Sequence, residues 1–308
     1  MIYTVTLNPA IDYVVSLDAL VPGEINKTKT ENVVLGGKGI NVSLLLKALD
    51  TESTALGFVA GFTGEAVCTG MEAAGVKADF IHLESGLTRI NMKLHAAEET
   101  EINGCGPDIP GDKLALFMAQ LETLCAEDTL VLSGSVPRSL PADIYEQIAR
   151  RVSEKGARLI VDAAGKLLQS TLHYKPFLVK PNRLELAALF GEPADIDEEV
   201  LDLAARLQEM GAQNVLISMA GDGALLRTAG GEIWKAPAAK GTVVNSVGAG
   251  DSMVGGFLAA LEKGGSFEEA LAMGTASGGA TAFSVGIADF QKIMAIHETV
   301  KTEVRRIG

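Results

Sequence analysis

The sequence predicts an α/β fold in which a mainly parallel sheet is covered by helices on both faces. Short runs rich in β-branched residues alternate with helical patterns of about ten residues or more along most of the chain. This alternation is typical of βαβ units, whose strands are buried on both faces. The apolar fraction of 47% in 308 residues is ample for such a core. No long linker or internal repeat interrupts the pattern, so we expect a single domain over residues 1–308.

The individual elements follow from the spacing of the apolar residues. Strands are expected at 5–7, 55–59, 129–132, 159–161 and 177–179. Helices are expected at 39–49, 64–74, 110–124, 141–154, 184–190 and 200–210, and over most of the remaining C-terminal part. The 110–124 helix is expected to open on Pro110, since proline is favoured in a first helical turn. A Gly-Asp-Gly turn between 215–218 and 224–227 indicates a β-hairpin.

One segment departs from this rhythm, because residues 88–96 alternate strictly between polar and apolar side chains. The two sets are Ile90, Met92 and Leu94 on one side, and Arg89, Asn91, Lys93 and His95 on the other. Residues 99–103 can return as a paired strand, and 11–17 and 28–35 are strand-like with no helix between them. We therefore expect a small, half-exposed sheet standing off the main core. An exposed apolar sheet face usually marks an interface, so this sheet is expected to join two copies of the chain.

Composition excludes several classes of protein. A formal net charge of −13 disfavours nucleic acid as a partner, since phosphate backbones require clustered Lys and Arg. The same charge means that any phosphate site must be locally positive. There is no run of about 18 apolar residues and no signal-peptide pattern, so no membrane association is expected. Cys68, Cys105 and Cys125 have no C-x-x-C spacing, which indicates buried thiols in a reducing cytoplasm.

The segment Asn245-Ser-Val-Gly-Ala-Gly-Asp251-Ser precedes an apolar helical pattern. Its Gly-Ala-Gly turn leaves the backbone bare where the helix begins, and free N–H groups at that position form an anion site. Asp251 lies beside this site and could take a proton from an attacking hydroxyl, or could be a plain helix cap. A dinucleotide-binding G-x-G-x-x-G motif is excluded by Met253, and no G-x-x-x-x-G-K-[ST] loop is present.

A second glycine-rich turn, Gly36-Gly37-Lys38-Gly39-Ile40-Asn41, stands ahead of a predicted helix. Its glycines let a ligand approach the backbone, Lys38 supplies charge, and Asn41 can bond hydroxyl groups. A surface turn with a solvated lysine is the alternative. Polar residues also follow several predicted strands, and ligands of open α/β sheets bind outside those carboxyl ends. These residues are Ser133, Ser135, Asp162, Lys180, Asn182 and Ser218.

Four further residues have weaker signals. Asn182 and Glu185 are three residues apart at a helix start and could hold a hydrated Mg²⁺, although an acid in a first helical turn more often serves the helix itself. Arg89 could bind a phosphate from the polar side of the small sheet, and Asp12 could bond sugar hydroxyls. Each could equally be a solvated or turn residue. The histidines show no metal-ligand spacing.

Taken together, these segments resemble the ribokinase-like sugar kinases, also called the phosphofructokinase B family. GGKGIN and SVGAGDS are similar to the two signature regions of that family, SMAGDGAL to its nucleotide-binding turn, and KPNRLEL to its N-x-x-E metal region. The resemblance covers essentially the whole chain. It implies a ribokinase-like three-layer sandwich whose small sheet, from about residues 11–35 and 87–105, is a discontinuous β-lid. It also implies ATP and Mg²⁺ as cofactors and a homodimer joined through the lid.

The resemblance assigns roles by position. It makes Asp251 the catalytic base, and the amides of Ala249, Gly250 and Asp251 the anion hole. The nucleotide side comprises Ser218, Met219, Ala220, Gly221, Asp222, Gly223, Gly248, Gly250, Lys180 and Asn182. The sugar-phosphate side comprises Asp12, Gly37, Lys38, Asn41 and Arg89, with Arg138 as an additional phosphate contact. Asn182 and Glu185 are the metal residues.

Within the family, TVTLNPAID, TRINMKL, LVKPNRLEL and VGAGDSMVGGF are most similar to the branch that phosphorylates D-fructose 1-phosphate. The implied reaction transfers the γ-phosphoryl group of ATP to the 6-hydroxyl and yields fructose 1,6-bisphosphate. Two alternatives stay open. One is a kinase for another phosphorylated ketose, such as tagatose 6-phosphate or fructose 6-phosphate. The other is a sugar-binding regulator without turnover, against which Asp251 and the intact glycine turn count.

Overall fold

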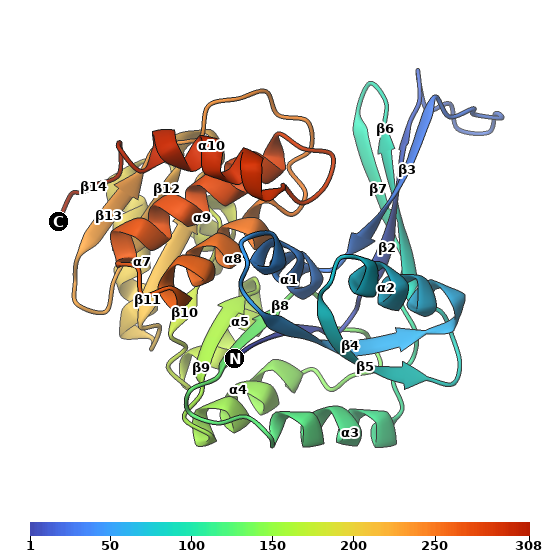
Figure 1. Cartoon of the computed structure of the whole chain (residues 1–308), viewed down its shortest axis with the longest axis horizontal. Coiled ribbons are helices and arrows are strands. Elements are labelled where there is room, and N and C mark those ends of the chain that lie inside the picture. The colour runs from blue at the N-terminus through green and yellow to red at the C-terminus, as the bar shows by residue number, and fades with distance from the viewer.

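A ten-stranded sheet forms the centre of the computed structural model, which describes residues 1–308 (Figure 1). Its strand order is β14-β13-β12-β11-β10-β9-β8-β1-β4-β5. Neighbouring strands from β11 to β5 are parallel, and β12, β13 and β14 extend the sheet with antiparallel pairs. The strands are β1 (Ile2–Thr6), β4 (Ser53–Ala60), β5 (Lys77–Leu83), β8 (Thr129–Ser133), β9 (Arg158–Asp162), β10 (Leu178–Val179), β11 (Asn214–Ser218), β12 (Ala224–Arg227), β13 (Ile233–Ala236) and β14 (Arg305–Arg306).

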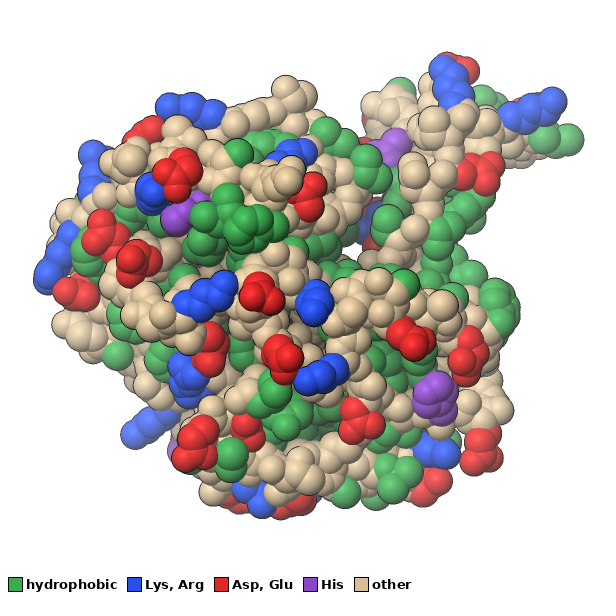
Figure 2. Space-filling model, viewed as in Figure 1, with side chains coloured by type: hydrophobic (Ala, Val, Ile, Leu, Met, Phe, Trp, Pro, Cys, Tyr) green, Lys and Arg blue, Asp and Glu red, His purple; other side chains and the backbone are tan.

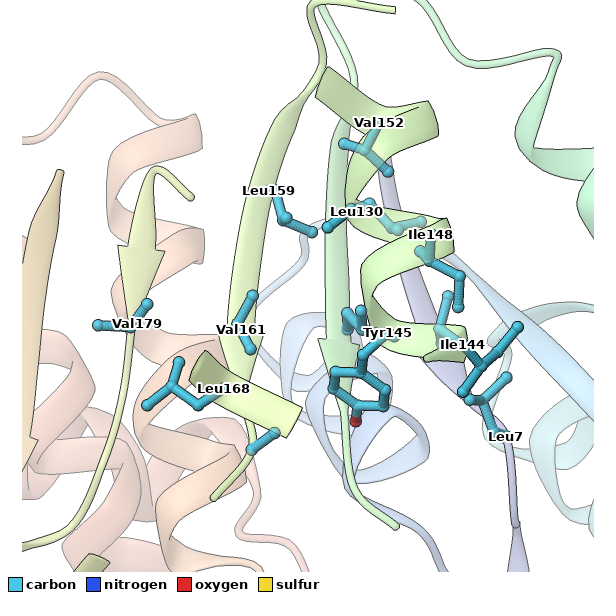
Figure 3. Close-up of a cluster of buried hydrophobic side chains, with 14 of the residues drawn as sticks. Leu7, Leu130, Ile144, Tyr145, Ile148, Val152, Leu159, Val161, Leu168 and Val179 are labelled. Carbon is cyan, nitrogen blue, oxygen red and sulfur yellow. The ribbon is translucent and has the colours of Figure 1, made fainter. Parts of the chain in front are cut away.

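Helices cover both faces of this sheet and bury a separate apolar cluster on each. One face carries α3 (Gly111–Leu121), α4 (Ile144–Glu154), α5 (Gly165–Leu172), α6 (Arg183–Phe190) and α7 (Asp197–Glu209). The other carries α1 (Lys38–Ala48), α2 (Gly61–Ala73), α8 (Ala249–Glu262), α9 (Phe267–Ala282) and α10 (Phe290–Val300). Figure 3 shows the first cluster, in which the α4 side chains Ile144, Ile148 and Val152 lie beside Leu130 of β8 and Leu159 of β9. Their spacing of four residues gives the helix one apolar side.

A second, four-stranded sheet stands away from this body in Figure 1 and forms the lid. It contains β3 (Thr30–Gly36), β2 (Ala10–Ser16), β6 (Arg89–His95) and β7 (Glu99–Asn103), in that spatial order. Strands β2 and β6 are parallel, and the outer pairs are antiparallel. The polar side of β6 is the covered one, because Asn91 and Lys93 are buried. On the apolar side, Leu94 is buried whereas Ile90 and Met92 are 44% and 38% exposed.

The predicted fold class and the β11–β12 hairpin are confirmed. Helix α3 begins one residue later than predicted, with Pro110 as its N-cap. The pattern did not predict α5, β5, β13 or β14. Strand β5 was missed because it is an edge strand with several exposed polar residues, and α5 because eight residues are too few for a clear helical period.

The cysteines and the membrane prediction can also be compared with the structure. All three cysteines are free, but only Cys68 is even half-buried. Burial of Cys105 and Cys125 was wrongly predicted, since both lie in exposed connections outside the helices and strands. None of the helices combines the length and the apolar character that crossing a bilayer requires.

Candidate active site

The start of α8 presents unpaired backbone N–H groups to the cleft. Gly248 is the N-cap, with a positive φ of 80° that favours glycine. The Ala249 N–H donates to the Ser246 carbonyl at 3.3 Å, whereas no hydrogen bond engages the N–H of Gly250 or Asp251. Of the three amides predicted to bind an anion, two are therefore free, and the third is tied into the turn. A helix start with free N–H groups is suited to a phosphate group.

The Asp251 side chain is buried beside these amides, with only 6% of the residue exposed. Its Oδ2 accepts a hydrogen bond from Asn41 Nδ2 at 2.8 Å. Burial and the nearby charge of Asp162 raise the pKa of Asp251 to about 6, although Lys38, Asn41 and Lys180 oppose the shift. A carboxylate with this pKa is ionised at neutral pH and is a stronger base than an exposed aspartate.

Two lysines lie around a second buried carboxylate. Asp162, at the end of β9, is fully buried, and its Oδ1 accepts from Lys38 Nζ at 3.1 Å and from Lys180 Nζ at 3.2 Å. Burial opposes ionisation of Asp162, but the two lysines outweigh it and hold its pKa below the usual range. The predicted residues Lys38, Lys180, Asn41 and Asp251 thus come together at one point of the cleft.

The predicted nucleotide turn borders a large cavity on one side of α8. The cavity has a volume of about 1150 Å³, which is ample for a nucleoside triphosphate. Its lining includes the predicted residues Asn182, Ser218, Met219, Ala220, Gly221, Asp222, Gly223, Ala249 and Gly250. Gly223 has a φ of 88°, and a Cβ there would lie 2.1 Å from the Ala236 carbonyl oxygen, so the turn requires glycine. Arg183 pairs with Asp222 at 2.8 Å and fixes the outer side of this turn.

The second glycine-rich turn places the start of α1 against β1. Gly37 has a φ of 125°, and a Cβ on it would lie 2.7 Å from Thr6 Cγ2. A Cβ on Gly39 would lie 2.7 Å from the Val5 carbonyl oxygen. The two glycines therefore allow the close contact that sets Lys38 and Asn41 beside Asp251 and Asp162.

The lid contributes a line of paired charges on its cleft-facing side. Asp12 of β2 accepts from Asn91 Nδ2 at 2.8 Å and lies 3.4 Å from Lys93 Nζ, both of β6. Asp12 and Asn41 line a cavity of about 440 Å³ between the lid and the body. Arg89 donates through Nε to the Asn8 carbonyl at 3.2 Å, which leaves its two terminal nitrogens without a partner. Burial lowers the pKa of Arg89, and Asp12 opposes this change. The open notch between lid and body is visible in Figure 2.

Arg138 is not brought into this arrangement. It lies exposed between β8 and α4 and forms no hydrogen bond or ion pair. Asn182 and Glu185 instead close a capping box at the start of α6, in which Asn182 Oδ1 accepts from the Glu185 N–H and Glu185 Oε2 from the Asn182 N–H, both at 2.8 Å. The amide oxygen of Asn182 is thereby used, while Glu185 Oε1 is unpaired. One free carboxylate oxygen fits a Mg²⁺ held largely by water and substrate phosphates.

Several cleft residues were not identified from the sequence. Asn91 and Lys93 were assigned only to the polar side of a strand, and Asp162 only to a strand end. The far wall of the nucleotide cavity, including Ala238–Gly241, Thr275, Gly278, Gly279 and Phe283, was missed. Most of these residues are small or apolar and have no local chemical signature. The packing of α9 beside α8 and the loop after β13 bring them to the cavity.

The fold and this cleft define a carbohydrate kinase, and comparison with known proteins gives the same class. The model of the pfkB family of carbohydrate kinases matches residues 5–293, so the chain belongs to that family. Its members transfer a phosphoryl group from ATP to a sugar or sugar phosphate, and this protein is therefore a kinase.

Particular relatives refine this classification. The chain is 47% identical to a 1-phosphofructokinase of Bacillus subtilis over 92% of its own length and 93% of the relative. It is 38% identical to a D-tagatose-1-phosphate kinase of Bacillus licheniformis over 95% and 96% of the two chains. Phosphofructokinase-2 of Escherichia coli, solved with substrates and products, superposes with a TM-score of 0.90 at 27% identity, covering 97% and 99% of the chains. The same enzyme has also been solved as a tetrameric inhibited form.

Proposed function

We propose that this enzyme uses ATP to phosphorylate D-fructose 1-phosphate at its 6-hydroxyl, giving fructose 1,6-bisphosphate and ADP. The observation that carries the proposal is the position of Asp251, which lies between the nucleotide cavity and the polar side of the lid. A sugar hydroxyl held there can face both a base and the terminal phosphate of ATP. The 47% identity to a 1-phosphofructokinase supports the choice of sugar.

In the proposed mechanism, Asp251 accepts the proton of the 6-hydroxyl as the oxygen attacks the γ-phosphorus in line. Asn41 holds the Asp251 carboxylate through Oδ2, which directs the other oxygen to the substrate. The free amides of Gly250 and Asp251 contact the equatorial oxygens of the transferred group, where negative charge is spread. Lys38 and Lys180 supply positive charge around the same group.

The sugar phosphate lies between the lid and α1 in this proposal. Asp12, held by Asn91 and Lys93, accepts bonds from the sugar hydroxyls. The two free nitrogens of Arg89 form a fork that binds the 1-phosphate, at the end of the sugar far from Asp251. Gly37 contributes through its backbone, because its close approach to Thr6 sets the start of α1, and with it Asn41, at the proposed sugar site. Arg138 makes no contact with these residues, and we keep it as an additional phosphate contact only because its guanidinium is exposed and unpaired.

Mg²⁺ is the proposed metal ion, and when bound it would neutralise part of the phosphate charge. Glu185 Oε1 would hold it through water, because Asn182 and the other Glu185 oxygen are already bonded in the capping box. We also propose a cytoplasmic setting, since the free thiols of Cys68, Cys105 and Cys125 persist where reductants are present.

D-Tagatose 1-phosphate is the second candidate substrate, because a kinase named for it is 38% identical to this chain. Tagatose differs from fructose only in the configuration at C4, so both sugars place the phosphate and the reacting hydroxyl at the same ends. Tagatose 6-phosphate and fructose 6-phosphate carry the phosphate on C6 and must present the 1-hydroxyl to Asp251 instead.

The deciding assay measures ADP release by the purified enzyme with each of these four sugar phosphates. Fructose 1-phosphate should have a kcat/KM at least about tenfold above each rival, equal to about 1.4 kcal/mol of transition-state preference. Equal turnover of tagatose 1-phosphate would limit the assignment to ketose 1-phosphates. Faster turnover of a 6-phosphate would refute fructose 1-phosphate as the substrate. If no sugar phosphate is turned over, the alternative of a sugar-binding regulator without turnover would be favoured.

The outer side of the lid supports a homodimer. The residues of this side include Val33 of β3, Ile90 and Met92 of β6, and Ile102 of β7, all at least 38% exposed. An apolar sheet face of this kind favours burial against a partner. We propose a second copy of the chain as that partner, because a twofold axis lets the same face meet itself and a relative of the same fold self-associates.

Sedimentation of Ile102→Lys tests this dimer. A charge on the apolar face should shift the dimer towards monomer at micromolar concentration, because an unpaired lysine would be buried at the interface. Ile196→Lys is the matched control, since Ile196 is 55% exposed beside α7 and outside the lid. A wild-type protein that sediments as a monomer would contradict the dimer.

A further inference from the structure

Asp162 is a buried charge that the proposed chemistry does not use directly. Its side chain is 1% exposed and lies at the carboxyl end of β9, in register with Ser133 at the end of β8. Its Oδ1 accepts from both Lys38 and Lys180, and its Oδ2 is buried without a partner. A buried carboxylate costs stability unless it is paired, so a position that binds two cations needs an explanation.

The two lysines reach this carboxylate from opposite sides of the cleft. Lys38 is the first residue of α1, three positions before Asn41, and its side chain is 36% exposed. Lys180 follows β10 and is 3% exposed. A Cβ on Gly250 would lie 3.2 Å from Lys180 Nζ, so this ammonium group rests against the first turn of α8. One lysine therefore belongs to the acceptor side and the other to the nucleotide side.

Like charges repel, and two ammonium groups would not stay close in this buried position without an anion between them. Asp162 is the anion that holds them. Its charge also faces Asp251, as do Lys38 and Asn41 from α1 and Lys180 from the segment after β10. A change at Asp162 therefore alters both the positions of the lysines and the electrostatic environment of Asp251.

We propose that Asp162 is a positioning residue, which holds Lys38 and Lys180 as a pair so that both contact the phosphoryl group as it passes from ATP to the sugar. This inference rests on the phosphoryl transfer proposed above. Asp162 itself touches neither substrate. Its function is to place two cations on the two sides of the transferred group, where they offset charge throughout the reaction.

Asp162→Asn tests the proposal, because it keeps the shape of the side chain and removes the charge. We expect kcat to fall about 10²-fold, as for a small misplacement of groups that stabilise a transition state. Because the Asp162 charge raises the pKa of Asp251, its removal should also move the acidic limb of the kcat/KM profile to lower pH. A residue with only a structural role would not move that limb.

Asp128→Asn is the matched control. Asp128 is also a buried carboxylate, and it pairs with the N-terminal ammonium at 3.2 Å. It precedes β8 and so lies at the amino end of the strands, whereas Asp162 lies at their carboxyl end. Replacement of Asp128 should lower the unfolding temperature but leave kcat and the pH profile unchanged. Rates are measured with whichever sugar phosphate the wild-type enzyme turns over fastest, so an error in the substrate proposed above leaves this test intact.

A folded Asp162→Asn enzyme with kcat within about threefold of wild type and an unshifted acidic limb would overturn the proposal. If that variant does not fold, a double-mutant cycle of Lys38→Met and Lys180→Met decides instead. Lysines held by one carboxylate should be coupled, so the effect of the double variant on kcat should differ at least about fivefold from the product of the single effects. If the effect of the double variant on kcat equals the product of the two single effects, Asp162 does not hold the two lysines as a pair.

Discussion

The proposed nucleotide side of the cleft is built mainly from backbone, whereas the proposed sugar side is built from polar and charged side chains of the lid. Beside α8, positive-φ glycines and two free amides form the surface that the phosphates of ATP would meet. On the lid, Asp12, Asn91, Lys93 and Arg89 supply the polar groups. Backbone amides are present whatever the sequence and bind any phosphate, whereas a mutation can replace a side chain and so change which sugar is bound. We therefore expect the lid to set which sugar is used and the main sheet to supply the common chemistry.

Asp251, which lies between the two sides, should give the largest effect. Asp251→Asn should lower kcat by about 10²–10⁴-fold, because an amide cannot accept the proton. ATP binding should be retained, since the amides of Gly250 and Asp251 stay in place. Gly248 and not Asp251 is the N-cap of α8, so near-wild-type turnover would mean that Asp251 does not act as the base. Asp143→Asn, at the exposed N-cap of α4, is the control and should keep full activity.

The same variant has a consequence for stability. The raised pKa of Asp251 means that its charged form is less favourable in the folded protein than in the unfolded chain. This charge therefore lowers stability above pH 6, and the loss disappears as pH falls towards the ordinary value of 3.8. Asp251→Asn should unfold at a higher temperature than wild type at pH 7, with the difference vanishing near pH 4. Calorimetry at the two pH values checks the sign.

Arg89 on the lid should give the next largest effect. Loss of a charge-assisted phosphate contact costs about 1.5–3 kcal/mol, so Arg89→Ala should lower kcat/KM for the sugar phosphate about 10- to 100-fold. KM for ATP should barely change, because Arg89 does not line the nucleotide cavity. Arg150→Ala, an exposed arginine of α4, is the control. A rise in KM for ATP without a change for the sugar phosphate would mean that Arg89 contacts the nucleotide and not the sugar phosphate.

A change of pH should have a smaller effect on kcat/KM than the loss of Arg89. Asp251 must be ionised to act as the base, so kcat/KM should fall as pH drops through about 6. At pH 5 the loss should be about tenfold relative to neutral pH. The profile is measured under conditions where the protein stays folded. A limb that appears only near pH 4, the range of an exposed aspartate, would contradict the buried environment of Asp251.

The smallest expected effect concerns the nucleotide turn. Gly223→Ala places a side chain at a positive φ and against the Ala236 carbonyl, and should cost about 1–3 kcal/mol of stability. It should also raise KM for ATP and leave KM for the sugar phosphate unchanged. Gly230→Ala is the control, because Gly230 does not line the nucleotide cavity and a Cβ there would meet only Thr228 Oγ1 at 3.7 Å. Equal effects of the two substitutions on KM for ATP would mean that the backbone geometry of the turn at Gly223 does not determine nucleotide binding.

Much of this protein could be predicted from the sequence, because the relevant signals are local. The alternation of strands and helices predicted the layered sheet, and the strict polar–apolar alternation of 88–96 predicted the lid strand. The glycine turns before α1 and α8 predicted where ligands could approach the backbone. Each of these features depends on residues a few positions apart, whose periodicity or bond rotation determines the outcome.

Other features depend on contacts between distant segments, and only the tertiary structure decided them. Asp162 binds two lysines that lie far apart in the sequence, and Asn91 and Lys93 reach Asp12 across neighbouring strands. Only the structure showed that the Asn182 amide oxygen and one Glu185 oxygen are bonded in a capping box, which leaves the other Glu185 oxygen free. Whether a charge is paired, buried or free depends on which strands lie side by side, and periodicity along one segment does not contain that information. The chemistry of Asp251 could therefore be suggested by its motif, but its pKa could only come from the fold.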